Sequence, residues 1–349
     1  MSDATEATAP EDAAGAGADD RRLPAEWELH ALTIMGWPCR VELWGETIER
    51  ARADYAAVAN AIAQFEPVLM IANPGRDAAD ARAACGNGVE IAEFALDDSW
   101  LRDCGPIYVR DRAGGREAIH FRFNAWGERF HPYDRDAEVG ALVARRLGDP
   151  VTEAPIVLEG GSILSDGEGT ILTTEQCLLN PNRNPGLHRE AIEAQLQRYL
   201  GAERIVWLGN GLVEDRDTDG HVDLVAAFVA PGRVLLQTVE QDNPNYEHSA
   251  ENLRRLGEAG VDVIELPFLP YAEVAGERVA TGYLNLYICN HAVIVPVSGA
   301  DTDEQALTII GQALPGREVV TVPGPVLAYG GGGPHCITQQ VPAKTSEDA

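Results

Sequence analysis

A cysteine that follows a run of four glycines is the residue of this chain best placed to act as a nucleophile. The glycine run 330–333 is followed by Pro334, His335 and Cys336. Glycine adopts backbone angles closed to other residues and lets another group come close to the chain. A thiolate is a strong nucleophile. We therefore predict that Cys336 attacks a bound substrate, although a lone cysteine is more often a small hydrophobic core residue.

Three further polar clusters lie at expected strand ends or turns. They span residues 97–106, 159–161 and 217–223. The acidic and basic groups that they offer for catalysis are Asp103, Glu159, His221 and Asp223. Corresponding ends of repeated modules point to the same central region. We therefore expect these four side chains to meet the cysteine at one site.

The residue types of this set favour one kind of substrate. A histidine can protonate a leaving group and later activate water. Several carboxylates in one pocket repel each other and raise each other's pKa values, unless the ligand is a cation. A planar guanidinium matches paired carboxylates with its fork of N–H donors. The set therefore predicts attack by Cys336 on a guanidinium carbon.

Each of these residues also has an ordinary structural interpretation. His221 alone could be a core or surface histidine, Glu159 an acid in a turn, and Asp103 the partner of Arg102 in a solvated ion pair. If residues 220–223 form an extended strand, side-chain alternation places their histidine and aspartate on the same side. Their joint occurrence on a repeating frame favours the catalytic interpretation.

The elements that must position these groups recur along the chain. A strand–turn–strand–helix–strand unit repeats four or five times at a spacing of about 50 to 70 residues, which is typical of a propeller or a ring of modules. The alternative is a doubly wound open sheet, but hairpins followed by a single helix depart from strict β-α alternation. One unit has strands at 222–229, 234–239 and 262–266 and a helix at 246–257. Other helices are predicted at 53–65, 136–147, 189–200 and 303–313, and the last strand at 318–321.

The composition excludes some classes of partner. The chain has 349 residues, 45% of them hydrophobic, as expected for a globular protein with one large domain. Its net charge is −28, which argues against nucleic acid and anionic membranes, since both require a basic face. The charge would attract a small cation, or only maintain solubility. The six scattered cysteines form no Cys-x-x-Cys pair, which argues against zinc or iron–sulfur sites and favours reduced thiols in a cytoplasm.

The two ends of the chain differ from the rest in composition. Residues 1–20 are rich in Ala, Gly, Asp and Glu, without the basic and apolar regions of a signal peptide. No window approaches the roughly 20 apolar residues of a membrane span. We predict a disordered acidic tail over residues 1–24, a single domain over 25–342 and a flexible tail over 343–349.

Six stretches carry a resemblance that covers the chain from about Trp27 to Pro342. They are residues 97–106, 159–162, 167–170, 177–186, 217–223 and 335–340. These stretches are similar to those of the agmatine deiminases, which belong with bacterial peptidylarginine deiminases to the guanidino-modifying (pentein) superfamily. The resemblance implies an α/β fold, a five-bladed α/β propeller of pseudo-symmetric strand-strand-helix-strand modules around a central active site.

The resemblance also implies roles for the five candidate catalytic residues. Cys336 matches the nucleophile of the family and His221 its general acid/base. Asp103 and Asp223 match the carboxylates that bind the guanidinium. Glu159 matches the acid that supports the histidine and a substrate nitrogen.

Five other positions match substrate-binding residues. They are Trp100, Asp97, Asp217, Gly331 and Gly332. Trp100 and Asp217 match positions near the far end of the substrate, where the amine of agmatine would lie. Their structural alternatives are a core aromatic and a turn aspartate. The glycines would let the backbone pass close to the substrate, and no metal or organic cofactor is implied.

The implied function is hydrolysis of agmatine to N-carbamoylputrescine and ammonia through a covalent thiouronium on Cys336, in putrescine (polyamine) biosynthesis. An alternative is deimination of peptidyl arginine, free arginine or another guanidino compound. An amidinotransferase, in which an amine replaces water, and a propeller that only binds a cation are further alternatives. The intact set of thiol, histidine and carboxylates argues against the last, since binding alone needs no thiol. The sequence leaves open whether the chain forms a homo-oligomer.

Overall fold

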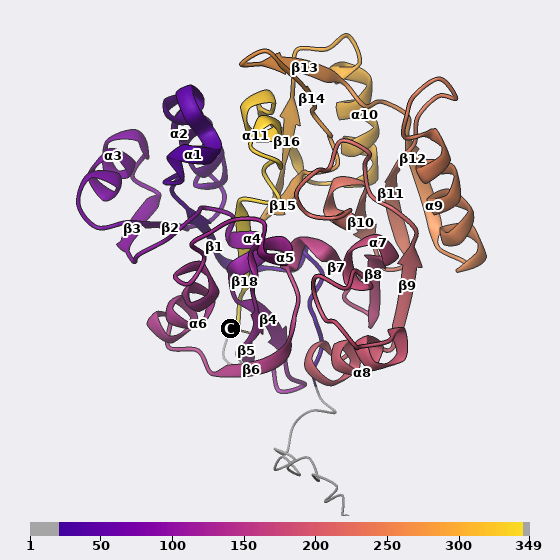
Figure 1. Cartoon of the computed structure of the whole chain (residues 1–349), viewed down its shortest axis with the longest axis horizontal. Coiled ribbons are helices and arrows are strands. Elements are labelled where there is room, and N and C mark those ends of the chain that lie inside the picture. The colour runs from indigo at the N-terminus through magenta and orange to yellow at the C-terminus, as the bar shows by residue number, and fades with distance from the viewer. Residues whose placement is uncertain (1–20, 345–349) are drawn as a thin grey trace, which may run out of the picture.

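The structure is a computed structural model, and it describes residues 21–344 of the chain. Residues 1–20 and 345–349, which belong to the two predicted tails, lie outside the described residues. The described β-structure consists of five small mixed sheets of three or four strands and one two-stranded hairpin. In Figure 1 the five sheets follow one another around a central region. The chain is therefore a mixed α/β protein.

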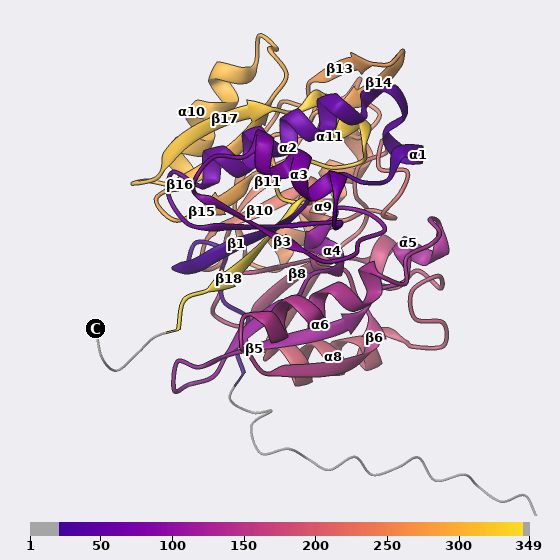
Figure 2. The same ribbon diagram turned by 90° about the vertical axis from the view of Figure 1, so that its left-hand side faces the viewer.

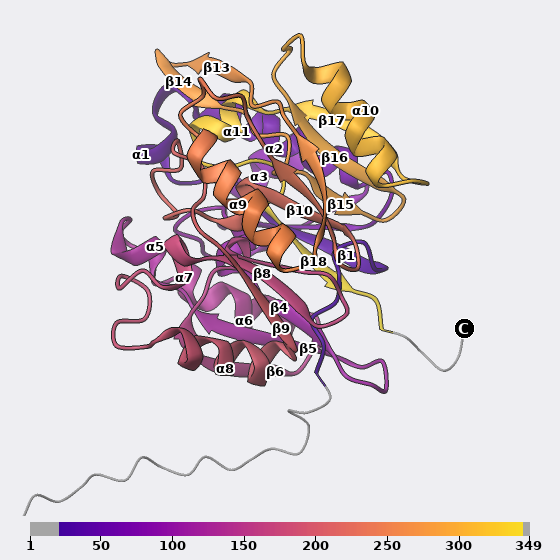
Figure 3. The same ribbon diagram turned by 90° about the vertical axis from the view of Figure 1, so that its right-hand side faces the viewer.

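The first sheet joins the two ends of the chain. Its strand order is β18-β1-β2-β3, with β18 antiparallel to β1 and the other pairs parallel. The two terminal strands lie side by side in Figure 2 and Figure 3. The elements of this sheet are β1 (His30–Gly36), α1 (Val41–Trp44), η2 (Gly45–Thr47), α2 (Ile48–Ile62), β2 (Val68–Ala72), α3 (Arg76–Ala84), β3 (Val89–Glu93) and β18 (Thr338–Pro342).

The second and third sheets share one pattern, in which an antiparallel pair is followed by a helix and by a strand parallel to the second. The second unit contains α4 (Leu101–Cys104), β4 (Ile107–Arg110), β5 (Arg116–Arg122), α5 (Ala125–Glu128), α6 (Asp136–Arg146) and β6 (Val151–Val157). The third unit contains η3 (Gly160–Ser162), β7 (Ile163–Ser165), β8 (Thr170–Thr174), α7 (Glu175–Leu178), α8 (Arg189–Leu200) and β9 (Arg204–Leu208).

The fourth and fifth sheets repeat the same pattern. The fourth unit contains η4 (Val222–Leu224), β10 (Ala226–Ala230), β11 (Arg233–Gln237), α9 (Tyr246–Glu258) and β12 (Asp262–Leu266). The hairpin of β13 (Tyr271–Val274) and β14 (Glu277–Ala280) follows it. The fifth unit contains β15 (Tyr287–Cys289), β16 (Ala292–Val297), α10 (Asp303–Ala313), β17 (Glu318–Pro323) and α11 (Pro325–Tyr329).

Long helices fill the spaces between neighbouring sheets. Helix α9 contacts β12 of its own sheet and β9 of the preceding one, and α2 contacts β2 as well as β16 and β17. In α2 the buried residues Tyr55, Val58 and Ile62 recur at helical spacing. Full burial stabilises a valine or isoleucine side chain by about 1.5–3 kcal/mol. Strand β2 is buried along its whole length, as expected for a strand covered on both faces.

The structure confirms some predicted elements and corrects others. The helices predicted at 189–200 and 303–313 have these bounds. The strand predicted at 222–229 is wrong at its start, because residues 222–224 form the 3-10 turn η4 and β10 begins only at Ala226. The side chain of Asp215 accepts hydrogen bonds from several backbone N–H groups of residues 217–221 and folds them into a compact loop. His221 and Asp223 are therefore not related by strand alternation.

Contacts of the folded domain extend beyond both predicted boundaries. Arg22 and Arg110 exchange two backbone hydrogen bonds of 2.8 and 2.9 Å, although residues 21–24 were assigned to the tail. At the other end, the Ala343 N–H donates to the Leu29 carbonyl at 2.8 Å. Backbone hydrogen bonds of this kind do not depend on apolar residues, so no pattern in the sequence predicts them. None of the described helices is long and apolar enough to span a membrane.

Candidate active site

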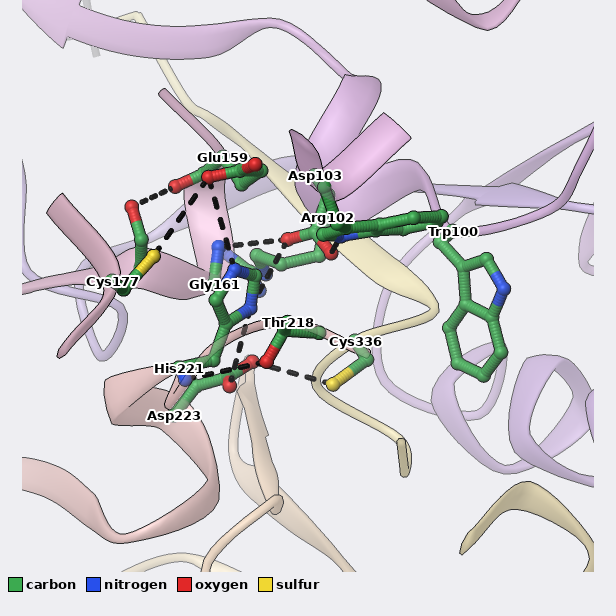
Figure 4. Close-up of polar contacts among 12 residues, drawn as sticks. Trp100, Arg102, Asp103, Glu159, Gly161, Cys177, Thr218, His221, Asp223 and Cys336 are labelled. Atoms are coloured by element: carbon green, nitrogen blue, oxygen red, sulfur yellow. Dashed lines mark hydrogen bonds and ion pairs between the residues drawn. The ribbon is translucent and has the colours of Figure 1, made fainter. Parts of the chain in front are cut away.

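Three short helical turns and one loop meet at the centre of the described chain. Turn α4 contacts η3 and β18, and η3 contacts η4. Each turn precedes the first strand of its unit, and the loop with Cys336 precedes β18. The structure thereby brings together all five predicted catalytic side chains, which are at most 6% exposed. Figure 4 shows His221 among Glu159, Asp103 and Asp223, with Cys336 next to Asp223.

The imidazole of His221 lies among three carboxylates. Its Nδ1 is 3.8 Å from Asp103 Oδ1 and 4.0 Å from Asp223 Oδ1, and its Nε2 is 3.9 Å from Glu159 Oε2. Neither ring nitrogen makes a hydrogen bond to another described residue. Burial alone would lower the pKa of His221, but Asp103, the Cys177 thiol and Glu159 together raise it well above its usual value. The ring is therefore an imidazolium that can donate a proton.

The carboxylate of Asp103 is fixed by two donors. Gly161 N–H donates to Oδ1 and Trp126 Nε1 to Oδ2, both at 2.9 Å. Burial, with smaller contributions from Asp223 and Glu159, raises the pKa of Asp103 to about 6 against the opposing effect of His221. Trp126 has a left-handed backbone (φ 55°), a strained conformation that is concentrated at functional sites. This tryptophan was not predicted from the sequence, where its signal is a Trp-Gly pair shortly after a strand.

Glu159 forms a fully buried ion pair with Arg183. Arg183 Nε lies 2.5 Å from Glu159 Oε1, and both side chains have an exposed fraction of 0%. The same guanidinium contacts Asp219 Oδ2 at 2.7 Å and the Thr218 carbonyl at 2.9 Å. Burial would raise the pKa of Glu159, but Arg183 and His221 lower it below its usual value. Arg183 lies in a stretch that carried the resemblance, yet the sequence assigned it no role.

The two oxygens of Asp223 have different surroundings. Oδ2 lies 2.8 Å from His335 Nδ1, whereas Oδ1 is buried without a hydrogen-bond partner among residues 21–344. Burial would raise the pKa of Asp223, but the hydrogen bond and charge of His335, with the charge of His221, lower it. Asp223 is therefore an ionised carboxylate with one oxygen available to a cation.

The thiol of Cys336 lies between an amide and a carboxylate. Its Sγ is 3.1 Å from Asn285 Nδ2 and 3.4 Å from Asp223 Oδ2. Burial, Asp223 and Asp103 raise the pKa of Cys336 well above the usual value. A positive charge bound between the two carboxylates would lower it again. Asn285 was not predicted from the sequence; it lies shortly before β15, as Asp103 lies shortly before β4.

The glycine loop is packed tightly against groups of the protein. A Cβ on Gly330 would lie 2.1 Å from Trp44, and one on Gly332 would lie 2.8 Å from both Cys336 Sγ and Trp100. Gly331 has a left-handed backbone (φ 108°) and lines the pocket beside Asp217. The loop therefore excludes side chains because protein groups come close to it. Substrate contacts of Gly331 and Gly332 stay a prediction.

A narrow pocket leads from Cys336 and Asp103 to the surface. Its lining also includes Trp100, Trp126, Phe130, Leu43, Asp98, Asp217, Thr218, Gly330 and Gly331. The Trp100 ring stacks on Trp44 with centroids 5.9 Å apart, so this side chain both packs in the core and faces the pocket.

The acidic residues near the outer end differ in their pairing. The half-buried Asp217 carboxylate makes no hydrogen bond or ion pair with a described residue, and burial and Asp215 raise its pKa. Asp98 is paired with Arg40 Nε at 2.8 Å. The Asp97 carboxylate accepts from Arg135 N at 2.9 Å and is not part of the pocket lining in the described structure. Of the two predicted acids here, only Asp217 faces the pocket.

One cluster within residues 21–344 has the composition of a metal site. Glu159, Cys177 and His221 offer ligand atoms within 4.8 Å of one another. Glu159 is already paired with Arg183, and its charge also stabilises the protonated His221. Metal ligation requires a neutral histidine. These groups therefore fit an acid/base pair better than a metal-binding set.

The fold and the site together define a class of protein. Five mixed sheets surround a buried thiol, an imidazolium and carboxylates that can bind a planar cation. The sequence model of the Porphyromonas-type peptidyl-arginine deiminases matches residues 22–342. The chain belongs to this family.

Relatives and solved structures support this assignment. An agmatine deiminase of Pseudomonas aeruginosa is 42% identical over 93% of this chain and 96% of its own length. The structure of Enterococcus faecalis agmatine deiminase superposes with a TM-score of 0.90 at 33% identity, covering 95% of this chain and 99% of that one. A Cys-to-Ser variant of C. jejuni agmatine deiminase with substrate bound has a TM-score of 0.87 at 28% identity, covering 93% and 97% of the two chains.

Proposed function

We propose that this chain is an agmatine deiminase, a hydrolase that converts agmatine and water to N-carbamoylputrescine and ammonia in putrescine biosynthesis. The observation that carries the proposal is the position of Cys336 Sγ, 3.4 Å from Oδ2 of the ionised Asp223, whose Oδ1 lies 4.0 Å from the protonated His221. Similarity to proteins named agmatine deiminase supports it.

The first half-reaction begins when the guanidinium enters between Asp103 and Asp223. Its positive charge lowers the pKa of the Cys336 thiol, which loses its proton to solvent, and the thiolate attacks the guanidinium carbon. The carbon becomes tetrahedral as the C–S bond forms. Breakage of one C–N bond then releases ammonia, which takes the proton of His221. A thiouronium remains on Cys336.

The second half-reaction uses the histidine that the first has deprotonated. Neutral His221 accepts a proton from a water molecule, and the hydroxide adds to the thiouronium carbon. Breakage of the C–S bond releases the ureido product and restores the cysteine. The carboxylate of Glu159, which is paired with Arg183, stabilises the His221 imidazolium before the first half-reaction and again after the second.

The outer end of the pocket favours agmatine over free arginine. Asp217 presents a carboxylate that makes no hydrogen bond or ion pair with another described residue, near the position where the substrate's remote end would lie. The ammonium of agmatine complements this charge. The α-carboxylate of arginine would be repelled by it.

Two further parts of the proposal concern architecture and setting. We infer that the five sheets are the blades of a five-bladed α/β propeller, because the same unit recurs and the two terminal strands pair. A reducing, cytoplasmic setting agrees with the six unpaired cysteines.

The test is a substrate panel with detection of ammonia and of the ureido product. The wild-type protein should act on agmatine faster than on free arginine or a C-terminal arginine peptide. Cys336→Ala should lower turnover by at least about 10⁴-fold, because it removes the thiol that forms the covalent intermediate. Cys85→Ala, at a half-buried thiol far along the chain, is the control and should retain activity. Faster turnover of arginine or of the peptide would contradict agmatine as the substrate, and full activity of Cys336→Ala would contradict the mechanism.

A further inference from the structure

The segment before β1 makes polar contacts with three different units of the chain. The backbone of Arg22 forms a β-bridge with the backbone of Arg110 in β4. The Leu23 carbonyl accepts a hydrogen bond of 2.9 Å from the Ser165 hydroxyl in β7. The Ile288 N–H in β15 donates to Glu26 Oε1 at 2.7 Å. Residues 21–29 therefore connect separate sheets, and Glu26 reaches in among them.

A cavity separates this segment from the back of the catalytic turns. Its lining includes Glu26 from the segment and Arg102, Gly160, Asp223 and His335 from the centre of the molecule. Asp223 thus faces the active site with one oxygen and has this cavity behind it. The segment is close enough to act on the catalytic groups from behind.

Glu26 is an ionised carboxylate in this interior position. Its Oε2 lies 2.8 Å from His335 Nε2 and 3.2 Å from Arg102 NH2. Burial would raise the pKa of Glu26, but the charges of His335 and Arg102 and the hydrogen bond from His335 lower it to about 2. The positive charges of His335 and Arg102 therefore stabilise the ionised form of Glu26 in the protein interior.

His335 connects Glu26 to the active site. Its Nε2 faces Glu26 and its Nδ1 faces Asp223, both at 2.8 Å. Each ring nitrogen can donate to a carboxylate only when the ring carries both protons. Burial and Arg102 lower the pKa of His335, but Glu26 and Asp223 raise it above its usual value overall. The geometry and the charges thus agree on an imidazolium.

The far end of this series of hydrogen bonds is the reacting centre. His335 binds Asp223 Oδ2, which lies 3.4 Å from Cys336 Sγ. The remaining oxygen, Oδ1, is buried without a described partner and 4.0 Å from His221. Fixing Oδ2 from behind therefore directs the free oxygen toward the place where a guanidinium would lie.

We propose that Glu26 is a positioning residue of the active site, which acts through His335 to keep Asp223 charged and oriented toward the substrate. The inference rests on the proposed guanidine chemistry. It makes the segment before β1 part of the catalytic apparatus. Without the carboxylate of Glu26, the ring of His335 would keep its Nδ1 proton for Asp223 but lose its positive charge. Asp223 would then bind a cationic substrate less strongly.

The alternative is that Glu26 only ties the segment to the domain. Glu28 supplies the matched control, because it belongs to the same segment and also makes ion pairs. Its carboxylate pairs with Arg22 and with Arg110 at 2.9 Å, and it has no hydrogen bond to His335 or Asp223. Loss of its charge should loosen the segment without changing Asp223.

The experiment compares Glu26→Gln and Glu28→Gln in steady-state kinetics with agmatine and in thermal unfolding. Glu26→Gln should lower kcat/KM by about ten- to a hundredfold, the range found when the carboxylate behind a metal-ligating histidine is removed. Glu28→Gln should shift Tm by about as much as Glu26→Gln does, but it should keep kcat/KM within about twofold of the wild-type value. Glu26→Asp, which retains the charge, should recover part of the loss. His335→Asn, which breaks the same series of hydrogen bonds, is the second variant if Glu26→Gln does not fold.

A spectroscopic measurement tests the link without any substrate. In protein labelled with ¹⁵N-histidine, His335 should show the signals of a doubly protonated ring in wild type and in Glu28→Gln, and of a neutral ring in Glu26→Gln. His335→Asn identifies these signals. Equal kinetics of the two Gln variants, or an unchanged His335 spectrum in Glu26→Gln, would overturn the inference. Failure of the wild-type protein to act on agmatine would instead refute the proposed function, while the spectra still decide the Glu26–His335 link.

Discussion

The inner and outer ends of the pocket are built in different ways. At the inner end three reactive groups each have a polar partner behind them: Arg183 pairs with Glu159, His335 with Asp223 and Asn285 with Cys336. At the outer end Asp217 is half-buried and makes no such contact with another described residue. The reactive groups of the inner end are held by hydrogen bonds and ion pairs, whereas the outer end offers one carboxylate.

This difference separates the chemistry from the choice of substrate. Interactions that strengthen in the transition state must be fixed in advance, which requires supporting groups around each reactive side chain. Recognition of a remote ammonium needs only a charge of opposite sign, and near the surface such a pair contributes little free energy. Substitutions should therefore have large effects at the inner end and small ones at the outer end.

The largest effect is expected at the buried ion pair of Glu159. Arg183→Met keeps much of the side-chain volume but leaves the Glu159 carboxylate without its cation, in a site where both side chains are fully buried. Removing one partner of a buried pair typically destabilises a protein by about 3–5 kcal/mol. The free energy of unfolding in urea should fall by that amount. Turnover should fall as well, because a protonated Glu159 no longer stabilises the His221 imidazolium.

The matched control for this variant is an ion pair near the outer end. Arg135 lies 3.7 Å from Asp97 and its side chain is 58% exposed. Arg135→Met should change the free energy of unfolding by less than about 1 kcal/mol. Similar losses of stability in the two variants would mean that the inner end is no more tightly built than the outer one.

A medium effect is expected from the titration of Asp103. Its pKa of about 6 means that this carboxyl is protonated in most molecules at pH 5 and ionised at pH 7. Binding of a cation should therefore weaken as the pH falls below 6, with an affinity lower by about tenfold at pH 5. The measurement is calorimetry with agmatine on the Cys336→Ala protein, in which the thiol does not titrate.

Two comparisons identify the group that titrates. Butylguanidine, which lacks the amine, probes the inner end alone and should show the same loss of affinity below pH 6. In Asp103→Asn combined with Cys336→Ala, binding should be weaker and should no longer fall in this pH range. A pH dependence seen with agmatine but absent with butylguanidine would assign the titrating group to the outer end instead.

The same contrast appears in how much the sequence could predict. Cys336 and the polar clusters were recognisable because nucleophile, base and acids lie at turns of a repeated unit, and the structure places them at one centre. Helices such as α8 and α10 were found with their bounds because their apolar residues recur at helical spacing. Patterns of this kind can be read from the sequence alone, because they depend on residues that lie close together in the chain.

The supporting groups left no local pattern. Arg183, His335 and Asn285 act through contacts with residues 24, 112 and 51 positions away in the chain, so only the folded structure pairs them. Strand β18 was missed for a related reason, since its partner β1 lies at the other end of the chain. The turn at 222–224 was read as a strand because the side chain of Asp215 folds the preceding residues 217–221 into a loop, and the sequence does not show these hydrogen bonds.

The smallest effect is expected at Asp217. Asp217→Asn removes the charge that would attract the ammonium of agmatine, and a pair this near the surface contributes about 0.5–1 kcal/mol. KM for agmatine should therefore rise by roughly two- to fivefold with kcat unchanged, because the interaction is as strong in the ground state as in the transition state. The rate with butylguanidine should not change, since that substrate has no ammonium.

Asp97→Asn is the control, because the Asp97 carboxylate accepts from Arg135 N outside the described pocket lining. This variant should leave the kinetics with both substrates unchanged. A fall in kcat in Asp217→Asn would show that the outer end takes part in positioning the guanidinium, and the contrast between the two ends would have to be given up.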